Sequence, residues 1–177
     1  MVVLLAVVLT ACGRQDPAPV PRPEVQAAAS QGGFDATAQA FVELVIATDA
    51  QAAKLMDLGA ARASDPALRR FAGELAAARR SEAAGLHQIL GAARIPYVDN
   101  HAGHDMPGMP TEAELTALPA AADFDGELTR LVRAHLTESA TVATSGATSI
   151  THEETKAVAE KMVLDRATAL RSLDALG

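Results

Sequence analysis

Residues 41–56, FVELVIATDAQAAKLM, carry the pattern that decides the fold of this 177-residue chain. Apolar side chains recur here at spacings of three, four and seven residues, which places them along one face of an α-helix. These positions are Phe41, Leu44, Val45, Ala52, Leu55 and Met56. The pattern predicts an amphipathic helix over about residues 35–62, with this face packed against a partner.

A second helix is predicted directly after the first. Ser64-Asp65-Pro66 supplies an N-cap and a proline for the first helical turn, and apolar positions then continue to about residue 93. So short a connection makes the two helices antiparallel neighbours. Residues 34–93 are therefore expected to form a helical hairpin.

The same pattern returns in the second half of the chain. Thr111 and Glu114 have the spacing of a capping box and predict a short helix that ends near Pro119. Two long helices follow, over about residues 123–148 and 152–176. A second capping box, Thr151 with Glu154, is expected to begin the last helix.

A fixed offset of 87 residues relates the two halves without gaps. Residues 41–90 then lie over residues 128–177, and the helix breaks coincide because Ser64 falls on Thr151. Matched pairs include Gly59 with Gly146, Arg79 with Arg166, and Leu86 with Leu173. The chain therefore predicts an all-α, four-helix bundle made of two duplicated antiparallel hairpins, about 34–93 and 123–177, joined by a linker over 94–122.

Composition supports one helical domain of residues 34–177. Aromatic residues make up only 3% of the chain, whereas alanine is abundant and favours closely packed helices. The net charge of −7 argues against nucleic acid as a partner.

The N-terminus predicts export and lipid attachment. Residues 1–11, MVVLLAVVLTA, form an apolar run that ends in small residues directly before Cys12, the only cysteine. This arrangement is typical of a bacterial lipoprotein signal, so Cys12 is expected to carry lipid after cleavage. Alternate prolines predict an extended tether over residues 12–33. We expect the protein in the bacterial cell envelope, outside the cytoplasm, with the membrane as partner through its lipid; the alternative is a buried strand or short uncleaved anchor.

One segment of the predicted linker has the composition of a metal site. His101-Ala-Gly-His104-Asp-Met106-Pro-Gly-Met109 gathers two of five histidines and two of five methionines. Imidazole and thioether ligands together favour copper, because Met sulfur prefers Cu(I) and His nitrogen accepts either copper state. The alternative is a solvated, turn-rich loop, which also collects His, Gly and Pro.

The chain resembles the family called domain of unknown function 305. The resemblance rests on Asp65-Pro66-Ala-Leu-Arg69, His104-Asp-Met106-Pro-Gly-Met109, Thr111-Glu-Ala-Glu-Leu115 and Phe124-Asp125. It implies a ferritin-like fold, export, and a link to copper binding or copper tolerance. The family's specific motif is a His-His pair in the first helix of each hairpin, which corresponds here to positions within residues 45–52 and 132–139. Three of those four histidines are replaced, by Thr48, Asp49 and Leu136, and only His135 remains.

His135 is the remaining candidate inside the bundle, because it follows Leu131 on the predicted interior face. Glu138 lies one turn later, and Asp49 is near the equivalent place on the first helix, so these three residues form a conceivable cluster. The alternative is a core histidine bonded to a helix neighbour. The chain has no Glu-x-x-His, which excludes a di-iron carboxylate centre.

The remaining polar and sulfur-bearing candidates are interpreted as structural. His87 is expected to be exposed, His152 to begin a helix, and Met56 and Met162 to lie in the core. The second helix carries two arginine pairs that are expected on a solvated face: Arg69, Arg70, Arg79 and Arg80.

Neither a nucleophile elbow nor a phosphate-binding glycine loop occurs, so we expect no enzymatic activity. The sequence predicts a lipid-anchored copper-handling or copper-buffering protein. Its expected ligands are His101, His104, Met106 and Met109, with His135 as an inner ligand. The alternative is a degenerate family member that binds no metal and acts as a structural or protein-interaction lipoprotein.

Overall fold

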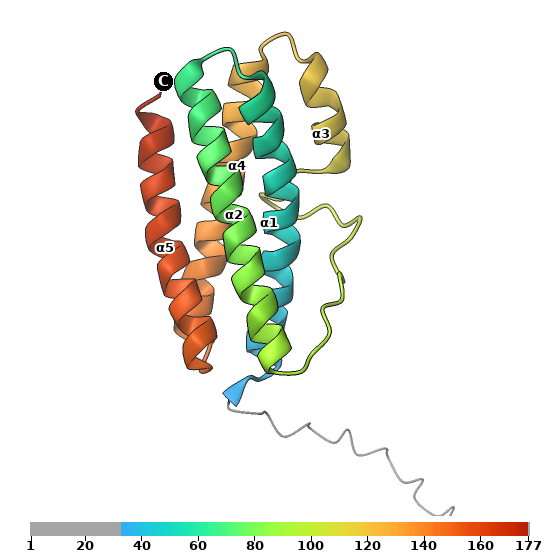
Figure 1. Cartoon of the computed structure of the whole chain (residues 1–177), viewed down its shortest axis with the longest axis vertical. Helices are drawn as coiled ribbons and strands as arrows, with labels where there is room; N and C mark the ends of the chain where they lie inside the picture. Colours follow the sequence, from blue (N-terminus) through green and yellow to red (C-terminus); the bar gives the residue numbers. More distant parts are fainter. Residues whose placement is uncertain (1–32, 177) are drawn as a thin grey trace, which may run out of the picture.

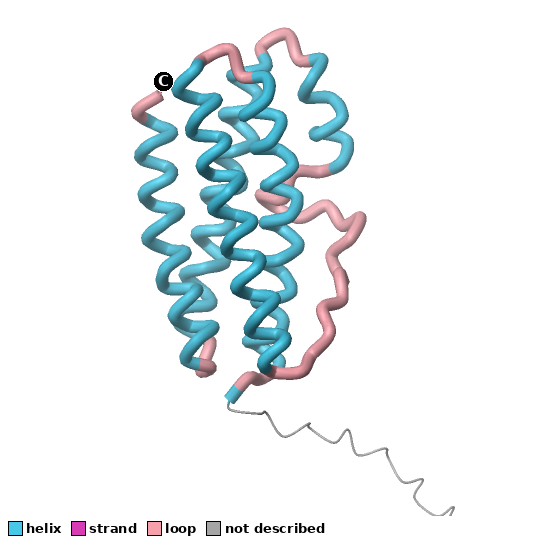
Figure 2. Tube along the Cα trace, viewed as in Figure 1, coloured by secondary structure: helices cyan, strands magenta, loops and turns pink. Residues whose placement is uncertain are grey.

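The computed structural model describes residues 33–176, and within them it holds helices and loops but no strand (Figures 1 and 2). The helices are α1 (Ala36–Arg62), α2 (Pro66–Ala92), α3 (Glu112–Ala117), α4 (Phe124–Ser149) and α5 (Glu153–Asp174), with a 3-10 turn at Leu118–Ala120. The four long helices form two antiparallel hairpins that pack side by side, which confirms the predicted bundle. None of the described helices is long and apolar enough to cross a membrane.

Side-chain caps begin the helices, as the sequence predicts for α2 and α3. Asp65 caps α2 ahead of Pro66, and Thr111 forms the complete capping box with Glu114 at α3. The box predicted at Thr151 is wrong. Helix α5 begins one residue later, and the Nδ1 atom of His152 accepts a hydrogen bond from the backbone N–H of Thr155 at 3.3 Å.

The helix ends repeat with the offset of 87 residues. Helices α1 and α4 end at Arg62 and Ser149, and helices α2 and α5 begin at Pro66 and Glu153. The residues that follow α1 and α4 each donate a backbone hydrogen bond to a glycine carbonyl, Gly59 or Gly146. The duplication read from the sequence therefore describes the local structure of both hairpins.

The two hairpins meet where those glycines let α1 and α4 approach closely. A Cβ atom on Gly59 would lie 2.8 Å from Leu128 of α4, and one on Gly146 would lie 2.6 Å from Phe41 of α1. Phe41 and Leu128 are themselves 87 residues apart. The contact between α1 and α4 therefore contains two equivalent glycine contacts, one from each hairpin. A pseudo-two-fold axis between the two helices has this consequence.

The hydrophobic core is divided into two clusters along the bundle. One contains Leu55, Leu68, Leu128 and Leu173, and the other contains Phe41, Leu86, Ala143 and Met162. On each long helix a polar residue stands between the two clusters in the sequence: Asp49 on α1, Arg79 and Glu82 on α2, Ser139 on α4 and Arg166 on α5. We call these five residues the polar layer.

Candidate functional site

Arg166 is the centre of the polar layer. Its side chain is fully buried and donates from Nη1 and Nη2 to the two carboxylate oxygens of Glu82, at 3.0 and 2.5 Å. Nη2 also reaches Asp49 Oδ1 at 3.4 Å, and Nε donates to Ser139 Oγ at 3.0 Å. One guanidinium on α5 therefore connects all four long helices, with the bidentate geometry that suits arginine and carboxylate.

Arg79 is the less satisfied arginine of the layer. Its Nη1 atom lies 3.8 Å from Asp49 Oδ1 and 3.6 Å from Glu82 Oε1, and neither distance is a hydrogen bond. Its Nε and Nη1 atoms are buried without a hydrogen-bond partner, as is Oδ2 of Asp49. Two carboxylates thus lie within ion-pair distance of Arg79, but two of its buried nitrogen atoms make no hydrogen bond, which is costly in a bundle interior.

The prediction that Arg79 lies on a solvated face is wrong, because its side chain is only 2% exposed. The position follows Ala72, Leu75 and Ala76 at helical spacings of seven, four and three residues, which places it on the buried face of α2. The offset of 87 residues also matches Arg79 with Arg166, and both arginines are buried.

The two carboxyl groups of the layer both have raised pKa values. Burial raises the pKa of Asp49, and the charge of Arg79 partly opposes this shift. Burial also raises the pKa of Glu82, and the neighbouring Asp49 carboxylate raises it further. Both acids accept protons more readily than exposed carboxyls do, which weakens their compensation of the arginines.

His135 lies beside this layer on α4 and is 1% exposed. Burial lowers the pKa of its imidazole to about 3, the charge of Arg79 lowers it further, and a hydrogen bond with the backbone of Gly108 opposes the shift. A bond that favours the protonated ring has the Gly108 carbonyl as acceptor. The ring is neutral at physiological pH, and its buried Nε2 atom has no hydrogen-bond partner.

A cavity of about 170 Å³ lies against His135 and is lined by residues of three helices and the linker. It is lined by Leu44, Val45, Thr48, Met106, Pro107, Gly108, His135, Glu138, Ser139, Val142 and Met162. Two thioether side chains, Met106 from the linker and Met162 from α5, thus share a cavity with an imidazole that has a free nitrogen.

Gly108 allows the linker to approach α4 closely at this cavity. Its φ of +71° is in the left-handed region, and a Cβ atom there would lie 2.4 Å from Glu138 Cβ and 3.0 Å from the Ala134 carbonyl oxygen. Only glycine meets both conditions. Met106, two residues earlier, is among the residues that line the cavity.

The family model of domain of unknown function DUF305 matches residues 38–176. The chain belongs to the DUF305 family. Its fold is similar to the crystal structure of a presumed secreted protein DUF305 from Streptomyces coelicolor, with 21% identity, a TM-score of 0.72, and coverage of 81% of this chain and 93% of that one. A DUF305 fragment from Deinococcus radiodurans is 18% identical, with a TM-score of 0.69 and coverage of 80% and 95%. No curated protein matches the chain.

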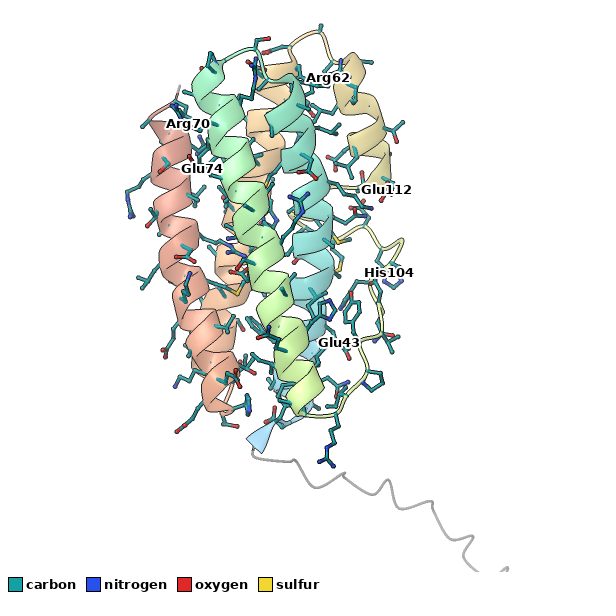
Figure 3. All side chains as sticks on the ribbon, viewed as in Figure 1. Glu43, Arg62, Arg70, Glu74, His104 and Glu112 are labelled. Carbon is teal, nitrogen blue, oxygen red and sulfur yellow. The ribbon has the colours of Figure 1, made fainter. Side chains whose placement is uncertain are left out.

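This DUF305 chain brings only part of its predicted site together. Met106 and His135 line the same cavity. Met109 is buried and lines a second hollow together with Met106 and Arg130, while His101 lines a separate groove of about 520 Å³ beside Glu43. His104 is exposed on the linker (Figure 3).

The cluster of Asp49, His135 and Glu138 is not formed. Within residues 33–176, no three His, Cys, Asp or Glu side chains gather closely enough to hold a metal ion. Asp49 instead contacts the two arginines of the polar layer. Cys12 and the predicted tether lie outside the described residues.

Met162 is the residue of this cavity that the sequence did not identify. Its prediction as a core side chain is confirmed, because it is 1% exposed, but it also lines the cavity of His135. The available signal was its spacing to Arg166, four residues later on the same face of α5. That signal carries meaning only once Arg166 is known to be buried.

Proposed function

We propose that this DUF305 protein is an exported, lipid-anchored copper-binding protein of the bacterial cell envelope. One observation carries the proposal: the unpartnered Nε2 atom of His135 lies in a buried position beside a cavity that Met106 and Met162 also line. Export is supported by the lipoprotein-like start of the chain and by the similarity to a presumed secreted protein.

The donor set fits a soft metal ion. A metal-binding histidine commonly donates its other ring N–H to a backbone carbonyl, which fixes the ring and leaves one nitrogen for the metal. The bond between His135 and Gly108 has this form. One imidazole and two thioethers are the ligands that Cu(I) prefers, whereas zinc and iron sites use more nitrogen, oxygen or thiolate.

In the bundle, His135, Met106 and Met162 would hold the ion, and copper would supply no reaction there. We propose binding and buffering without catalysis. His101, His104 and Met109, on the same linker, are proposed as outer ligands that take part before the ion enters the cavity. Support for this role is their position on the segment that closes the cavity, with His104 exposed to solvent.

The test is a competitive titration of the full chain with Cu(I) and a chromophoric chelator, under reducing, oxygen-free conditions. The chain carries Cys12→Ser, which removes the only thiol, and is kept in detergent. We expect one saturable site that is weakened at least about tenfold by His135→Leu and by Met162→Leu. Met56→Leu is the matched control, because Met56 is also fully buried but belongs to the other core cluster.

The competing function is a structural or protein-interaction lipoprotein without metal. The polar layer favours it, because its two arginines and two carboxyls pair with one another and connect helices of the bundle. Absence of saturable Cu(I) binding in the titration would support this second function and overturn the first.

Lipid attachment is tested separately from metal binding. Cells expressing the wild-type chain with labelled palmitate should yield a labelled protein in the membrane fraction. Cys12→Ser should abolish the label, and Ser30→Ala serves as a control in the same part of the sequence. Equal labelling of both variants would overturn the proposed anchor.

A further inference from the structure

We propose that residues 22–32 fold back against the bundle and occupy the groove between α1 and α4, with Arg22 paired to Glu43. The groove is part of the described bundle, whereas its proposed occupant is the segment that precedes the described residues. This docking needs no metal ion, so it goes beyond the proposed copper binding.

The groove has the size and the lining of a binding site. Its volume is about 520 Å³, and it lies between the N-terminal part of α1, the C-terminal part of α4 and the linker residues Asn100 and His101. Clefts of this size with largely apolar walls and a few polar groups are typical of ligand sites. The apolar part of this wall consists of Ala40, Phe41, Leu44, Val142, Gly146 and Ile150.

Glu43 supplies the groove with a carboxylate that has no charged partner in the bundle. It is 8% exposed, and its two oxygen atoms accept hydrogen bonds from Gln39 Nε2 at 2.8 Å and from Asn100 Nδ2 at 3.3 Å. Both donors are neutral amides, and no cationic side chain of residues 33–176 forms an ion pair with Glu43. Since a largely buried carboxylate is costly without an opposite charge, the groove suits a cation with apolar neighbours.

The chain enters the bundle at the end of this groove. Thr37, which lines the groove, follows Gly33, the first described residue, by only four positions. Gly33 has a φ of +80° and open space around its Cβ position. Glycine adopts this left-handed conformation without strain, and an abrupt change of chain direction often uses it. The residues before Gly33 are therefore able to turn back along α1.

The composition of this segment matches the groove. The alternate prolines end at Pro23, and residues 24–31 contain Val25 and three consecutive alanines at 27–29. Such small apolar side chains suit the apolar part of the groove wall. Arg22 is the cation nearest to the bundle in this part of the sequence, and the other is Arg14.

The segment is long enough to bring Arg22 to Glu43. Arg22 precedes Gly33 by 11 residues, which span up to about 36 Å when extended. The stretch of α1 from Thr37 to Glu43 rises only about 10 Å. The segment therefore reaches Glu43 with length to spare.

Docking also shortens the free part of the predicted tether. Cys12 precedes Gly33 by 21 residues, a span of up to about 69 Å, but it precedes Arg22 by only 10 residues, or about 33 Å. The docked segment would hold the bundle closer to the membrane. This consequence rests on the proposed lipid anchor, whereas the docking itself does not.

Paramagnetic NMR of the metal-free full chain tests the docking. The isotope-labelled chain carries Cys12→Ser and Gln26→Cys, and a nitroxide is attached to the new thiol. We expect the label to broaden the amide signals of Ala40 and Val142 in the groove, but not that of Leu55 in the other core cluster.

Charge variants then test the pairing. Glu43→Gln keeps the shape of the side chain and should lower the ratio of docked to free segment about fivefold, as loss of one ion pair of about 1 kcal/mol predicts. Arg22→Gln should have the same effect, and the double variant should lower the ratio no further than either single change. Glu74→Gln and Arg14→Gln are matched controls with the same changes of charge, and Glu74 is exposed on α2, away from the groove.

Each outcome supports or overturns the docking. Absence of broadening in the groove, or equal effects of Glu43→Gln and Glu74→Gln, would overturn it. A mixture of nitroxide-labelled and isotope-labelled chains identifies a second copy as the occupant if broadening passes between chains, which would also overturn it. Broadening within one chain that only the Arg22 and Glu43 variants reduce would support it. None of these results bears on copper binding, because the sample holds no metal.

Discussion

The Nε atom of Arg166 donates a hydrogen bond to the Oγ atom of Ser139 at 3.0 Å, which joins the polar layer to the wall of the His135 cavity. Arg166 and Ser139 lie on α5 and α4, the two helices of the second hairpin. The same guanidinium also binds Glu82 and Asp49 of the first hairpin. Stability and the candidate site therefore depend on one buried side chain.

Replacing Arg166 should destabilise the bundle strongly. Arg166→Met leaves Glu82 and Asp49 buried without their main partner, and breaking a buried charge pair in this way costs about 3–5 kcal/mol. Urea unfolding followed by circular dichroism measures the loss. Arg171→Met, on the same helix but exposed, should change stability by less than about 0.5 kcal/mol. A loss for Arg166→Met no larger than for this control would contradict the structure of the layer.

Gly108→Ala should displace the linker from α4. The new Cβ atom would meet Glu138 at 2.4 Å, in addition to the strain of a positive φ, and we expect a loss of about 1–3 kcal/mol together with weaker Cu(I) binding. Gly103→Ala is the matched control, because Gly103 also has a positive φ but open space around its Cβ position. Similar effects of the two substitutions on Cu(I) affinity would show that the approach of Gly108 to α4 is unimportant.

His135 should make the metal-free protein sensitive to acid. Its pKa is lowered in the folded state to about 3 from the ordinary 6.5, so between these values the unfolded state binds more protons. Stability therefore falls as the pH drops below 6.5, by about 2 kcal/mol at pH 5 from this residue. His135→Leu should lose this dependence.

The two raised carboxyl pKa values act in the opposite direction, because the folded state then binds more protons and stability falls as the pH rises through their titration. They are present in both proteins, so the informative quantity is the difference between wild type and His135→Leu at each pH. That difference should change by about 2 kcal/mol between pH 7 and pH 5. A constant difference would show that His135 is not buried in its neutral form.

The helices could be predicted because their signals are local and repeated. Apolar spacing, Asp65-Pro66 and the Thr111 box each depend on a few neighbouring residues, and the offset of 87 checks one hairpin against the other. The cap of α5 was misplaced by one residue because Thr151 and His152 are both able to accept the first backbone N–H.

The site could be predicted only in part, because it depends on which segments meet. Residue chemistry identified Met106 and His135 as candidate ligands. That they line the same cavity depends on the close approach of Gly108 to α4, which the sequence does not reveal. Arg79 was expected on a solvated face because a charged residue is usually solvated, and its ion pair with Asp49 of α1 is apparent only when the helices are packed. Met162 looked like an ordinary core residue, which it also is.

X-ray absorption spectroscopy of the Cu(I)-loaded chain carrying Cys12→Ser is the most direct test of the proposal that His135, Met106 and Met162 bind copper, because it counts the ligand atoms by element. We expect one nitrogen and two sulfur ligands, with one sulfur lost in Met106→Leu and one in Met162→Leu, and no change in Met56→Leu. A spectrum with only nitrogen or oxygen ligands, unchanged by both methionine substitutions, would contradict it.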